Sequence, residues 1–327
     1  MTVRSICLSK LSEPPVIIES SLKALKPDQV RLKMLFSPIN PADLNMMDGH
    51  YVIQPDCPFT LGNEGVGVIV ERGADVDQEL VGKRVFFPFQ TRNQWFGFWS
   101  NYVTVTAKGC ILVPDFIDDQ QAAMLGINPL TALVMLTQYG ALTKDDWIVQ
   151  NAANSALGRW VIYIANQLGF QTINIIRDEA MINPLLELGA QSVLVFEKNF
   201  SRNISQKGSI KLALNGVGGD SAKELAKCLG SQGTLVTYGA MSKEPVSIGN
   251  VALIYKCILA TGFNRSVWAE SMSVEDITNL YNRLFTMLKR NPFTIPVNDV
   301  FDFCDVKPAL NRAFQSGLNG KVLLRFS

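Results

Sequence analysis

The stretch that most constrains the fold is WIVQNAANSALG, residues 147–158. Its apolar start is long enough only for a short buried strand, and apolar residues then recur at helical spacing from Trp160 to Leu168. In such a strand–turn–helix unit, small turn residues let a pyrophosphate approach the backbone, and the helix N-terminus supplies N–H groups and a partial positive charge. The stretch therefore predicts a dinucleotide site, although an ordinary strand-to-helix connection shares its local pattern.

Beyond Trp147, short apolar strands alternate with helical patterns. The strands are expected at WIVQNA, TINIIR, SVLVF, KLALNGV, TLVTYG and ILATGF, with helices at 156–168, 180–188, 220–229 and 250–256. This alternation predicts an α/β domain built on a doubly wound parallel sheet. Its ligand should lie at the carboxyl ends of the strands.

The first 117 residues show a different pattern, with period-two alternation broken by Gly, Pro and Asp. This pattern predicts a compact, barrel-like β domain. A further helix is expected at 273–289, and the chain then ends in a strand, KVLLRF, which we expect to pair with the first domain. We therefore predict a discontinuous catalytic domain of residues 1–117 and 292–327, and a nucleotide-binding domain of residues 118–291.

The composition argues against several classes of function. The formal net charge of +1 comes from nearly equal acids and bases without a long run of one sign, so neither nucleic acid nor a membrane is an expected partner. Six singly placed cysteines and an N-terminus without an apolar block predict a reduced, cytoplasmic protein. The chain has one histidine, His50, which is too few for a typical zinc site. Asn63 in LGNEGVG is a poor metal ligand and lies in an expected structural turn, so we expect no metal.

Arg177 follows the second strand of the parallel sheet, where dinucleotide-binding folds place the residue that meets the adenosine ribose. An acid there binds the free 2′-hydroxyl, whereas the planar fork of an arginine suits a 2′-phosphate. Arg177 therefore favours NADPH over NADH, with a solvated charge at a strand end as the alternative. Asp178 and Glu179 directly after it weaken this preference.

Tyr51 is the candidate acid–base residue of the first domain. It lies in the loop GHYVIQPDCP, from which a phenol can donate a hydrogen bond to a developing oxyanion or pass on a proton. His50 beside it is the other candidate, and for both the alternative is a structural loop residue. The aromatic group around Trp95 and Phe98 is expected to be a core patch, with the lining of an apolar substrate site as the alternative.

These pieces, in this order, resemble the medium-chain dehydrogenase/reductase superfamily, most closely its zinc-free branch of mitochondrial-type 2-enoyl thioester reductases. The matching stretches are INPADLNMMDGHY (39–51), LGNEGVG (61–67), LGINPLTA (125–132), QNAANSALG (150–158), INIIRD (173–178), LALNGVGG (212–219), GTLVTYGAM (233–241) and TGF (261–263). The resemblance implies a Rossmann domain and a discontinuous, GroES-like β-barrel catalytic domain. It also implies that no zinc is bound, because zinc alcohol dehydrogenases carry a ligand histidine where Asn63 stands.

The resemblance further implies a reaction of fatty acid metabolism, in which NADPH delivers hydride to the β-carbon of a trans-2-enoyl thioester while negative charge builds on the thioester oxygen. The substrate is an enoyl-CoA or an enoyl-ACP. The catalytic tyrosine falls on Tyr51, which orients the enoyl group and assists protonation of the α-carbon. The NADP(H) contacts fall on Asn128, Asn154, Ser155, Ala156, Leu157, Arg177, Asp178, Tyr238, Gly239, Ala240, Met241, Phe263, Asn264 and Lys321.

Three positions depart from the family pattern. Ala156 stands where the phosphate turn usually has glycine, Asn264 where the enoyl reductases have an aromatic residue, and Glu179 where a second basic residue is frequent. The change at Asn264 keeps open an alternative enzyme, a zinc-independent NADPH:quinone or general enone reductase, which needs no dedicated tyrosine. A non-catalytic NADPH-binding protein is a third alternative, disfavoured because Tyr51 and the nucleotide residues are retained.

Proteins of this superfamily are commonly dimers that pair the edge strands of their Rossmann sheets. The apolar stretch VALIYKCILATGF, residues 251–263, is the candidate edge, with a buried final strand and helix as the alternative. We therefore expect a homodimer that acts on a small-molecule substrate, either an enoyl thioester or a quinone.

Overall fold

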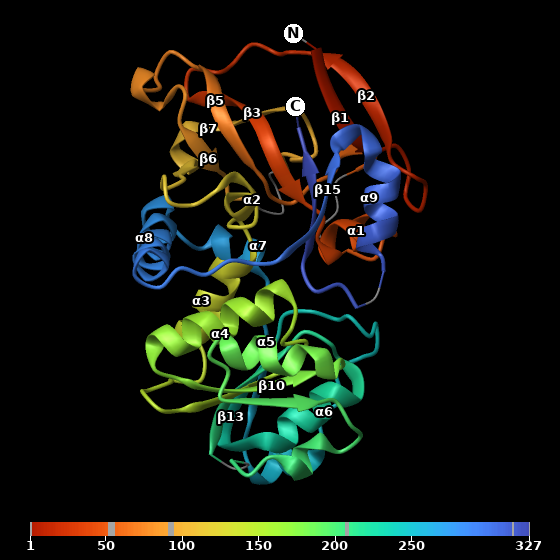
Figure 1. Ribbon diagram of the computed structural model, residues 1–327, viewed down its shortest axis with the longest axis vertical. Helices are drawn as coiled ribbons and strands as arrows, with labels where there is room; N and C mark the ends of the chain where they lie inside the picture. The colour runs from red at the N-terminus through yellow and green to blue at the C-terminus, as the bar shows by residue number, and fades with distance from the viewer. Residues whose placement is uncertain (1, 52–55, 91–94, 207–208, 316, 327) are drawn as a thin grey trace. The chain divides into compact units, whose positions relative to one another are not determined.

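The computed structural model describes residues 2–51, 56–90, 95–206, 209–315 and 317–326 (Figure 1). The chain forms two compact units. Unit 1 contains Met1–Ile127 and Ser266–Ser327, and unit 2 contains Asn128–Arg265. Unit 1 is therefore discontinuous in sequence.

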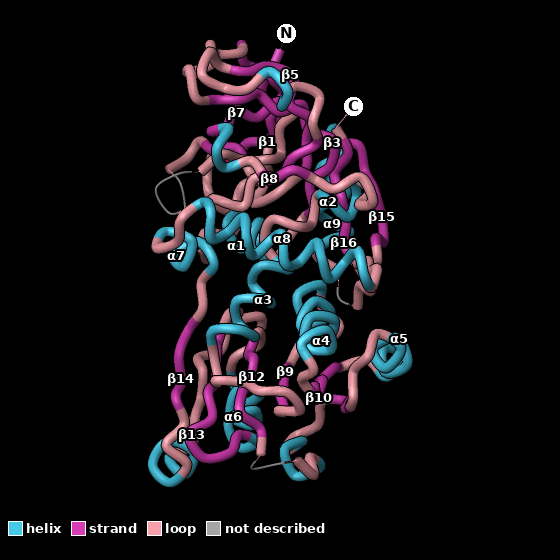
Figure 2. Tube along the Cα trace, turned by 90° about the vertical axis from the view of Figure 1, so that its left-hand side faces the viewer, coloured by secondary structure: helices cyan, strands magenta, loops and turns pink. Residues whose placement is uncertain are grey.

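Unit 2 contains the predicted parallel sheet. Its strands are β9 (Trp147–Gln150), β10 (Gln171–Ile176), β11 (Ser192–Val195), β12 (Ile210–Asn215), β13 (Leu229–Thr237) and β14 (Leu259–Gly262). Among the described residues they lie in the order β11-β10-β9-β12-β13-β14, and every neighbouring pair is parallel. Figure 2 shows β14 and β10 on opposite sides of this unit, with β12 and β9 between them. The doubly wound α/β fold is confirmed.

Helices cover both faces of this sheet. They are α3 (Asn128–Gln138), α4 (Ala156–Leu168), α5 (Ile182–Glu187) and α6 (Gly219–Cys228), with α6 on the other side of the sheet from α4 (Figure 1). Helix α4 begins at the predicted residue because Ser155 Oγ accepts a hydrogen bond from Gly158 N at 3.1 Å. It ends because Gly169 takes a left-handed φ of 78°.

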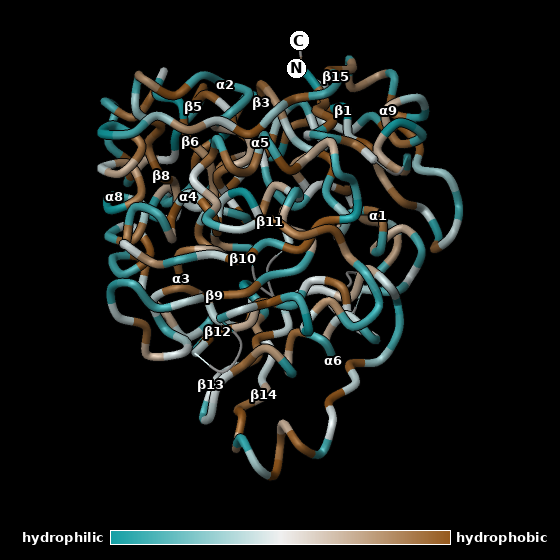
Figure 3. The backbone as a smooth tube through the Cα atoms, turned by 60° about the horizontal axis from the view of Figure 1, so that its bottom comes forward, coloured by the Kyte–Doolittle hydropathy of each residue, from teal (hydrophilic) through white to brown (hydrophobic). Residues whose placement is uncertain are grey.

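Strand β14 lies at the edge of the sheet and carries exposed apolar side chains. The residues before it, Val251–Tyr255, form a π-helical turn, η5, within the helix predicted at 250–256. Figure 3 shows brown, hydrophobic segments of chain near β14. The large apolar side chains exposed in this region are Val251, Leu253, Ile254, Tyr255 and Leu259. The alternative of a buried final strand and helix is therefore wrong.

The described residues of unit 1 form two sheets. Its strands are β1 (Thr2–Leu8), β2 (Val16–Ser21), β3 (Gln29–Pro38), β4 (Phe59–Thr60), β5 (Val66–Arg72), β6 (Arg84–Phe86), β7 (Tyr102–Thr106), β8 (Ile111–Leu112), β15 (Val297–Asp302) and β16 (Lys321–Arg325). One sheet has the order β2-β1-β4 and the other β15-β16-β3-β5-β6-β8, with β7 also paired to β3. The C-terminal strand β16 pairs with β3, which places Leu323 opposite Pro38. The predicted return of the chain end to the first domain is confirmed.

Helix α8 (Val274–Arg290) belongs to unit 1, although the predicted nucleotide-binding domain included it. The Tyr281 hydroxyl donates to Leu125 O at 2.8 Å, and its ring meets Phe86 edge to face with centroids 4.9 Å apart. These contacts attach α8 to the barrel, so the compact unit 128–265 is shorter than the predicted domain. The other helices of this part of the chain are α1 (Pro41–Met47), α2 (Asp119–Ala122), α7 (Arg265–Glu270) and α9 (Val306–Ala313).

The predicted aromatic core patch and the LGNEGVG turn are both structural. The Phe87 ring contacts Phe89 and Phe96 edge to face at centroid distances of 5.7 and 4.8 Å, and Trp99 is fully buried. Gly62 has a φ of 102°, and a Cβ there would lie 2.5 Å from Trp99 N. Only glycine fits at this turn.

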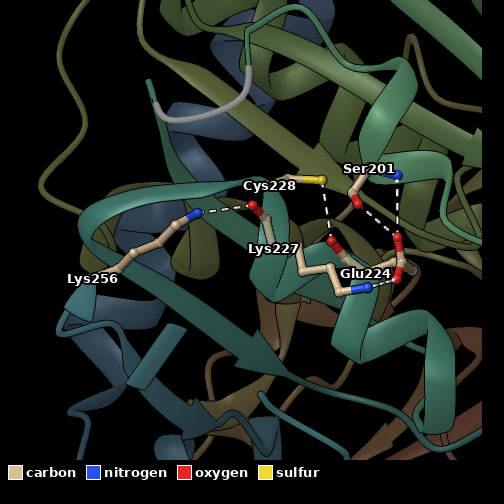
Figure 4. A network of polar contacts seen from close by, with 5 residues as sticks. All are labelled: Ser201, Glu224, Lys227, Cys228 and Lys256. Carbon is tan, nitrogen blue, oxygen red and sulfur yellow. Dashed lines mark hydrogen bonds and ion pairs between the residues drawn. The ribbon is translucent and has the colours of Figure 1, made fainter. Parts of the chain in front are cut away.

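A polar network joins the C-terminus of α6 to the segment that leads into β14 (Figure 4). Glu224 Oε2 accepts hydrogen bonds from Ser201 N and Oγ at 3.3 and 2.7 Å, and Glu224 Oε1 pairs with Lys227. Lys256 Nζ donates to Lys227 O at 2.9 Å and to Leu229 O at 2.6 Å. A cation at this end of a helix satisfies its last carbonyl groups and its negative dipole end.

Replacing Glu224 with glutamine is expected to lower the free energy of unfolding by about 1 kcal/mol at pH 7, because Lys227 is partly exposed and solvent screens the pair. Burial alone would raise the pKa of Glu224, but the hydrogen bonds from Lys227 and Ser201 outweigh it and hold that pKa below the ordinary 4.5. A carboxyl whose pKa is lowered by folding stabilises the folded protein at pH values above its ordinary pKa. This stabilisation is lost as the pH falls through the pKa of the folded protein. Urea unfolding between pH 3 and 7 should therefore show the two proteins converging at low pH; a constant difference would contradict the role of this carboxylate.

Candidate functional site

The turn between β9 and α4 has the tight geometry expected of a dinucleotide site. A Cβ added at Gly158 would lie 2.5 Å from Ala153 O, so a larger residue cannot pack against this turn. The predicted contact residues 154–156 are partly exposed at the N-terminus of α4, where the first N–H groups lack intrahelical partners. The side chain of the fourth predicted contact, Leu157, is buried.

The chain after β10 carries the predicted ribose residues on the surface. Arg177 and Glu179 are exposed. Asp178 Oδ1 accepts a hydrogen bond from Ala180 N at 3.0 Å and so begins the short 3₁₀ turn η3 (Glu179–Met181). One carboxylate oxygen of Asp178 is thus used to shape the turn.

Two buried asparagines, which were not among the predicted site residues, connect the ends of the central strands. Asn151 Nδ2 donates to Asn215 Oδ1 and to Ser221 Oγ, both at 2.9 Å. Asn151 Oδ1 accepts from Gly216 N at 2.7 Å, and Asn215 Nδ2 donates to Thr237 Oγ1 at 3.1 Å. The ends of β9, β12 and β13 are therefore held together by side-chain amides. Each asparagine directly follows or ends an apolar strand, which is the one signal that marks it in the sequence.

The loop after β13 contains four predicted cofactor contacts, residues 238–241. Tyr238 N donates to Asn215 O at 3.0 Å, and Met241 N donates to Gly216 O at 3.1 Å. A Cβ at Gly216 would lie 2.7 Å from the Tyr238 hydroxyl oxygen. Among the described residues this buried hydroxyl has no hydrogen-bond partner, and burial raises the pKa of Tyr238, so it remains a donor. Ala240 and Met241 are exposed.

Phe263 and Asn264 follow β14. Phe263 N donates to Thr237 O at 2.9 Å, and its ring meets Tyr139 edge to face at 6.2 Å, while Asn264 is exposed. The predicted nucleotide residues after β9, β10, β13 and β14 therefore all follow the carboxyl ends of parallel strands, which is where such sheets bind ligands. Asn128 is placed differently, as the first residue of α3.

Tyr51 lies in unit 1, shortly after α1, and is partly buried against the barrel core. Helix α1 is held by a capping box between Asn40 and Asp43, and it is followed by Gly49 at a φ of 74°. His50, the other candidate acid, is exposed. Residues 52–55, which continue the predicted loop, lie outside the described residues. Helix α1 was not predicted, because seven residues are too few for a helical period to show.

A buried polar cluster, formed by Asn40, Asp43, Asn63, Glu64 and Lys321, lies next to α1. Asp43 accepts from Asn40 N at 2.8 Å and from Asn63 Nδ2 at 2.7 Å. Asn40 Nδ2 donates to Glu64 Oε1 at 2.9 Å, and Lys321 Nζ donates to Asn40 Oδ1. Every member is less than one-tenth exposed. Lys321, a predicted cofactor contact, is therefore also a structural donor within unit 1.

Burial has the largest effect on the pKa values of the two titratable residues Asp43 and Lys321. It raises the pKa of Asp43 to about 6, although the hydrogen bonds from Asn40 and Asn63 and the charge of Lys321 act in the opposite direction. Burial likewise lowers the pKa of Lys321, opposed by the charges of Glu64 and Asp43. Glu64 Oε2 also accepts from Ile127 N at 3.0 Å, as expected of a residue that holds nearby backbone.

The side-chain amide nitrogen of Asn63 donates a hydrogen bond to Asp43, and such a nitrogen is a donor rather than a metal ligand. Within the described ranges, no three His, Cys, Asp or Glu side chains come together in a way that could hold a metal ion. None of the helices in these ranges is long and apolar enough to cross a membrane.

Solved structures share both units of this fold. A candidate NADPH:quinone reductase from Bacillus thuringiensis superposes with a TM-score of 0.90 at 28% identity and covers 99% of each chain. The complex of Etr1p with NADP and crotonyl-CoA superposes with a TM-score of 0.87 at 27% identity and covers 100% of each chain. The Etr1p/Etr2p heterodimer, a mitochondrial 2-enoyl thioester reductase from Candida tropicalis, gives the same TM-score and identity.

The compared relatives also correct one expectation. The human mitochondrial enoyl-[acyl-carrier-protein] reductase is 35% identical over 336 residues, which cover 98% of this chain and 88% of that protein. Because the relatives of the present chain are mitochondrial enzymes, the expected cytoplasmic location is wrong. Singly placed thiols indicate a reducing compartment, and the mitochondrial matrix is reducing as well as the cytosol.

Residues 26–115 match the alcohol dehydrogenase GroES-like domain, which is the expected family of the barrel in unit 1. Together with a parallel nucleotide-type sheet in unit 2 and a relative that matches nearly the whole chain, this domain decides the family. The chain belongs to the medium-chain dehydrogenase/reductase superfamily and is related within it to the mitochondrial enoyl-[acyl-carrier-protein] reductases.

Proposed function

We propose that the chain is an NADPH-dependent reductase of the 2,3 double bond of trans-2-enoyl thioesters, with either CoA or acyl carrier protein as the thiol carrier. The observation that carries this proposal is the match of 98% of the chain to an enoyl-[acyl-carrier-protein] reductase. The similar fold of an enzyme in complex with NADP and crotonyl-CoA supports the same substrate class.

The residues of unit 2 fit NADP(H). The turn at Gly158 and the N-terminus of α4 suit a pyrophosphate, and the exposed Arg177 suits a 2′-phosphate. The Tyr238 hydroxyl is a buried donor without a partner among the described residues, as a group awaiting a ligand acceptor would be. We therefore assign cofactor binding to the predicted residues of this unit and to Lys321.

When bound, NADPH would supply a hydride to the β-carbon of the enoyl thioester, and negative charge would develop on the thioester carbonyl oxygen. Tyr51 donates its hydroxyl proton in a hydrogen bond to that oxygen, which lowers the barrier because negative charge develops there. Protonation of the α-carbon then restores the thioester, and Tyr51 assists the delivery of this proton. The partly buried position of Tyr51 strengthens the hydrogen bond, since less water competes for the oxygen.

Replacing Tyr238 with phenylalanine should weaken NADPH binding about tenfold, because one hydrogen bond to the cofactor is lost. The free protein should be as stable as the wild type or slightly more stable, since a buried hydroxyl without a partner is removed. Fluorescence titration with NADPH and thermal unfolding without cofactor measure the two effects. Weaker binding together with lower stability of the free protein would indicate a purely structural hydroxyl.

The test of the proposed function is NADPH oxidation, followed by absorbance, with crotonyl-CoA, a longer trans-2-enoyl-CoA and a benzoquinone compared side by side. NADH is the cofactor control. Turnover of the enoyl thioesters well above that of the quinone supports the proposal, and turnover of the quinone alone refutes it.

A quinone reductase is the second candidate function. It is favoured by the candidate NADPH:quinone reductase of B. thuringiensis and by the polar Asn264 at the position where enoyl reductases have an aromatic residue. Under this alternative the quinone arm of the assay is fast and Tyr51 is dispensable.

We also propose that two copies pair through the β14 edge. The exposed apolar side chains of η5 and β14 support this, as does the dimeric assembly of the C. tropicalis reductase, which is a heterodimer. Sedimentation should give twice 36.1 kDa for the wild type and a monomer for the double variant Ile254→Lys and Leu259→Lys. Leu186→Lys, at an exposed leucine of α5, is the matched control and should remain dimeric. A monomeric wild type would refute the pairing.

A further inference from the structure

Arg159 is a buried arginine of α4, only 6% exposed. Its Nε donates to Asn154 O at 3.2 Å, and one terminal guanidinium nitrogen lies 3.9 Å from Met181 Sδ as a donor. Asn154 belongs to the turn after β9, and Met181 ends the turn η3 after β10. The guanidinium therefore lies between the first two loops of the predicted dinucleotide site.

The register of the sheet places both loops at the same edge. Strands β9 and β10 are adjacent and parallel, with Gln150 opposite Asn174, so their carboxyl ends lie side by side. In dinucleotide-binding sheets the adenosine ribose lies at the end of the second of these strands. Arg159 thus contacts the loop that follows the second strand, and Arg177 lies exposed at the end of the same strand.

The exposed charges at the end of β10 do not by themselves favour binding of the 2′-phosphate of NADPH. Arg177 is followed by Asp178 and Glu179, so one cation stands beside two acids in the sequence, and Arg177 and Glu179 are exposed to screening by solvent. Burial lowers the pKa of Arg159, but a guanidinium remains charged at neutral pH. A charge in a less polar environment acts more strongly on a neighbouring anion than an exposed charge does.

We propose that Arg159 is a specificity-determining residue, which distinguishes the 2′-phosphate of NADPH from the free 2′-hydroxyl of NADH. The planar fork of its guanidinium suits phosphate oxygens, and its contacts with Asn154 O and Met181 Sδ place it between the two loops that meet a dinucleotide in such folds. This inference rests on the proposed NADPH-dependent function and adds to it a cation that the family resemblance did not assign.

The test is calorimetric binding of adenosine 2′,5′-bisphosphate and of adenosine 5′-monophosphate, two probes that differ only in the 2′-phosphate. The ratio of their Kd values is expected to favour the bisphosphate in the wild type and to fall about tenfold or more in Arg159→Met, which keeps the packing volume and removes the charge. Arg159→Lys, which keeps the charge but not the planar fork, should retain only part of the ratio. Arg290→Met removes an exposed arginine of α8 and should leave both affinities unchanged.

Three results would overturn the inference: an unchanged ratio in Arg159→Met, an equal loss of affinity for both probes, or a wild-type ratio near one. An equal loss would mean that Arg159 only shapes the phosphate turn. If thermal unfolding shows that Arg159→Met is not folded, the same two affinities are measured with Arg159→Gln, which removes the charge but keeps a polar side chain. A wild type that binds neither probe would instead count against the proposed NADPH-dependent function, so the two failures are distinguishable.

Discussion

Replacing Tyr51 with phenylalanine is expected to lower kcat/KM for crotonyl-CoA by about 100-fold to 1,000-fold, because a single donor to a developing oxyanion has an effect of this size. The phenylalanine ring preserves the packing of Tyr51 against the barrel core, so stability should change little. NADPH affinity should also be unchanged, since the cofactor residues lie mainly in unit 2. Steady-state NADPH oxidation measures the first effect, and fluorescence titration the second.

Two comparisons make this result specific. His50→Gln changes the exposed neighbour of Tyr51 and should retain activity within about threefold, since a surface substitution leaves the oxyanion donor in place. Reduction of benzoquinone by the Tyr51→Phe variant should also be retained, because a quinone accepts hydride without an enolate. Full activity of Tyr51→Phe on crotonyl-CoA would exclude Tyr51 as the catalytic group and favour the quinone reductase.

Replacing Lys321 with methionine is expected to lower the free energy of unfolding by about 3 kcal/mol at pH 8, because the buried acids Asp43 and Glu64 then lose their cation. The loss should depend on pH. A raised carboxyl pKa means that the ionised form disfavours folding: for Asp43 this cost is absent below the ordinary 3.8 and grows as the pH rises through about 6. Without Lys321 the cost is larger, so the variant should lose more stability at pH 8 than at pH 5.

Urea unfolding monitored by tryptophan fluorescence measures this difference. Lys33→Met, at an exposed lysine of β3, is the matched control and should change stability by less than about 0.5 kcal/mol. Adding Asp43→Asn to Lys321→Met should make the remaining loss less dependent on pH, since one of the two buried acids is gone. A loss that is the same at pH 5 and pH 8 would show that Lys321 contributes packing rather than charge.

The fold could be predicted from the sequence largely because its elements are long enough to show a period. The parallel strands of unit 2 and α4 fall at their predicted positions, since buried strands and an amphipathic helix leave clear apolar patterns. The short helix α1 was missed for the opposite reason. The boundary at α8 was misplaced because that helix has an ordinary amphipathic pattern, and only Tyr281 and Phe86 show which unit its apolar face contacts.

The candidate site was predictable where it follows strand ends and not where it depends on packing. Arg177 could be proposed by counting strands, since the ligand edge of a parallel sheet is set by its topology, whereas Tyr238 was proposed from the family resemblance. Arg159 and Asn151 could not, because a polar residue within an apolar pattern does not reveal whether it faces solvent or a neighbouring loop. Their roles emerge from hydrogen bonds to residues distant in the chain.

The buried polar cluster of unit 1 also constrains how this sequence can diverge. Asn40 by itself hydrogen-bonds with Asp43, Glu64 and Lys321, so a substitution at this one position leaves several buried groups unsatisfied at once. A tolerated change must therefore be accompanied by a second change, or pass through an unstable intermediate protein. We expect these positions to vary together in related lineages, while exposed positions outside the candidate site, such as Lys33, drift independently.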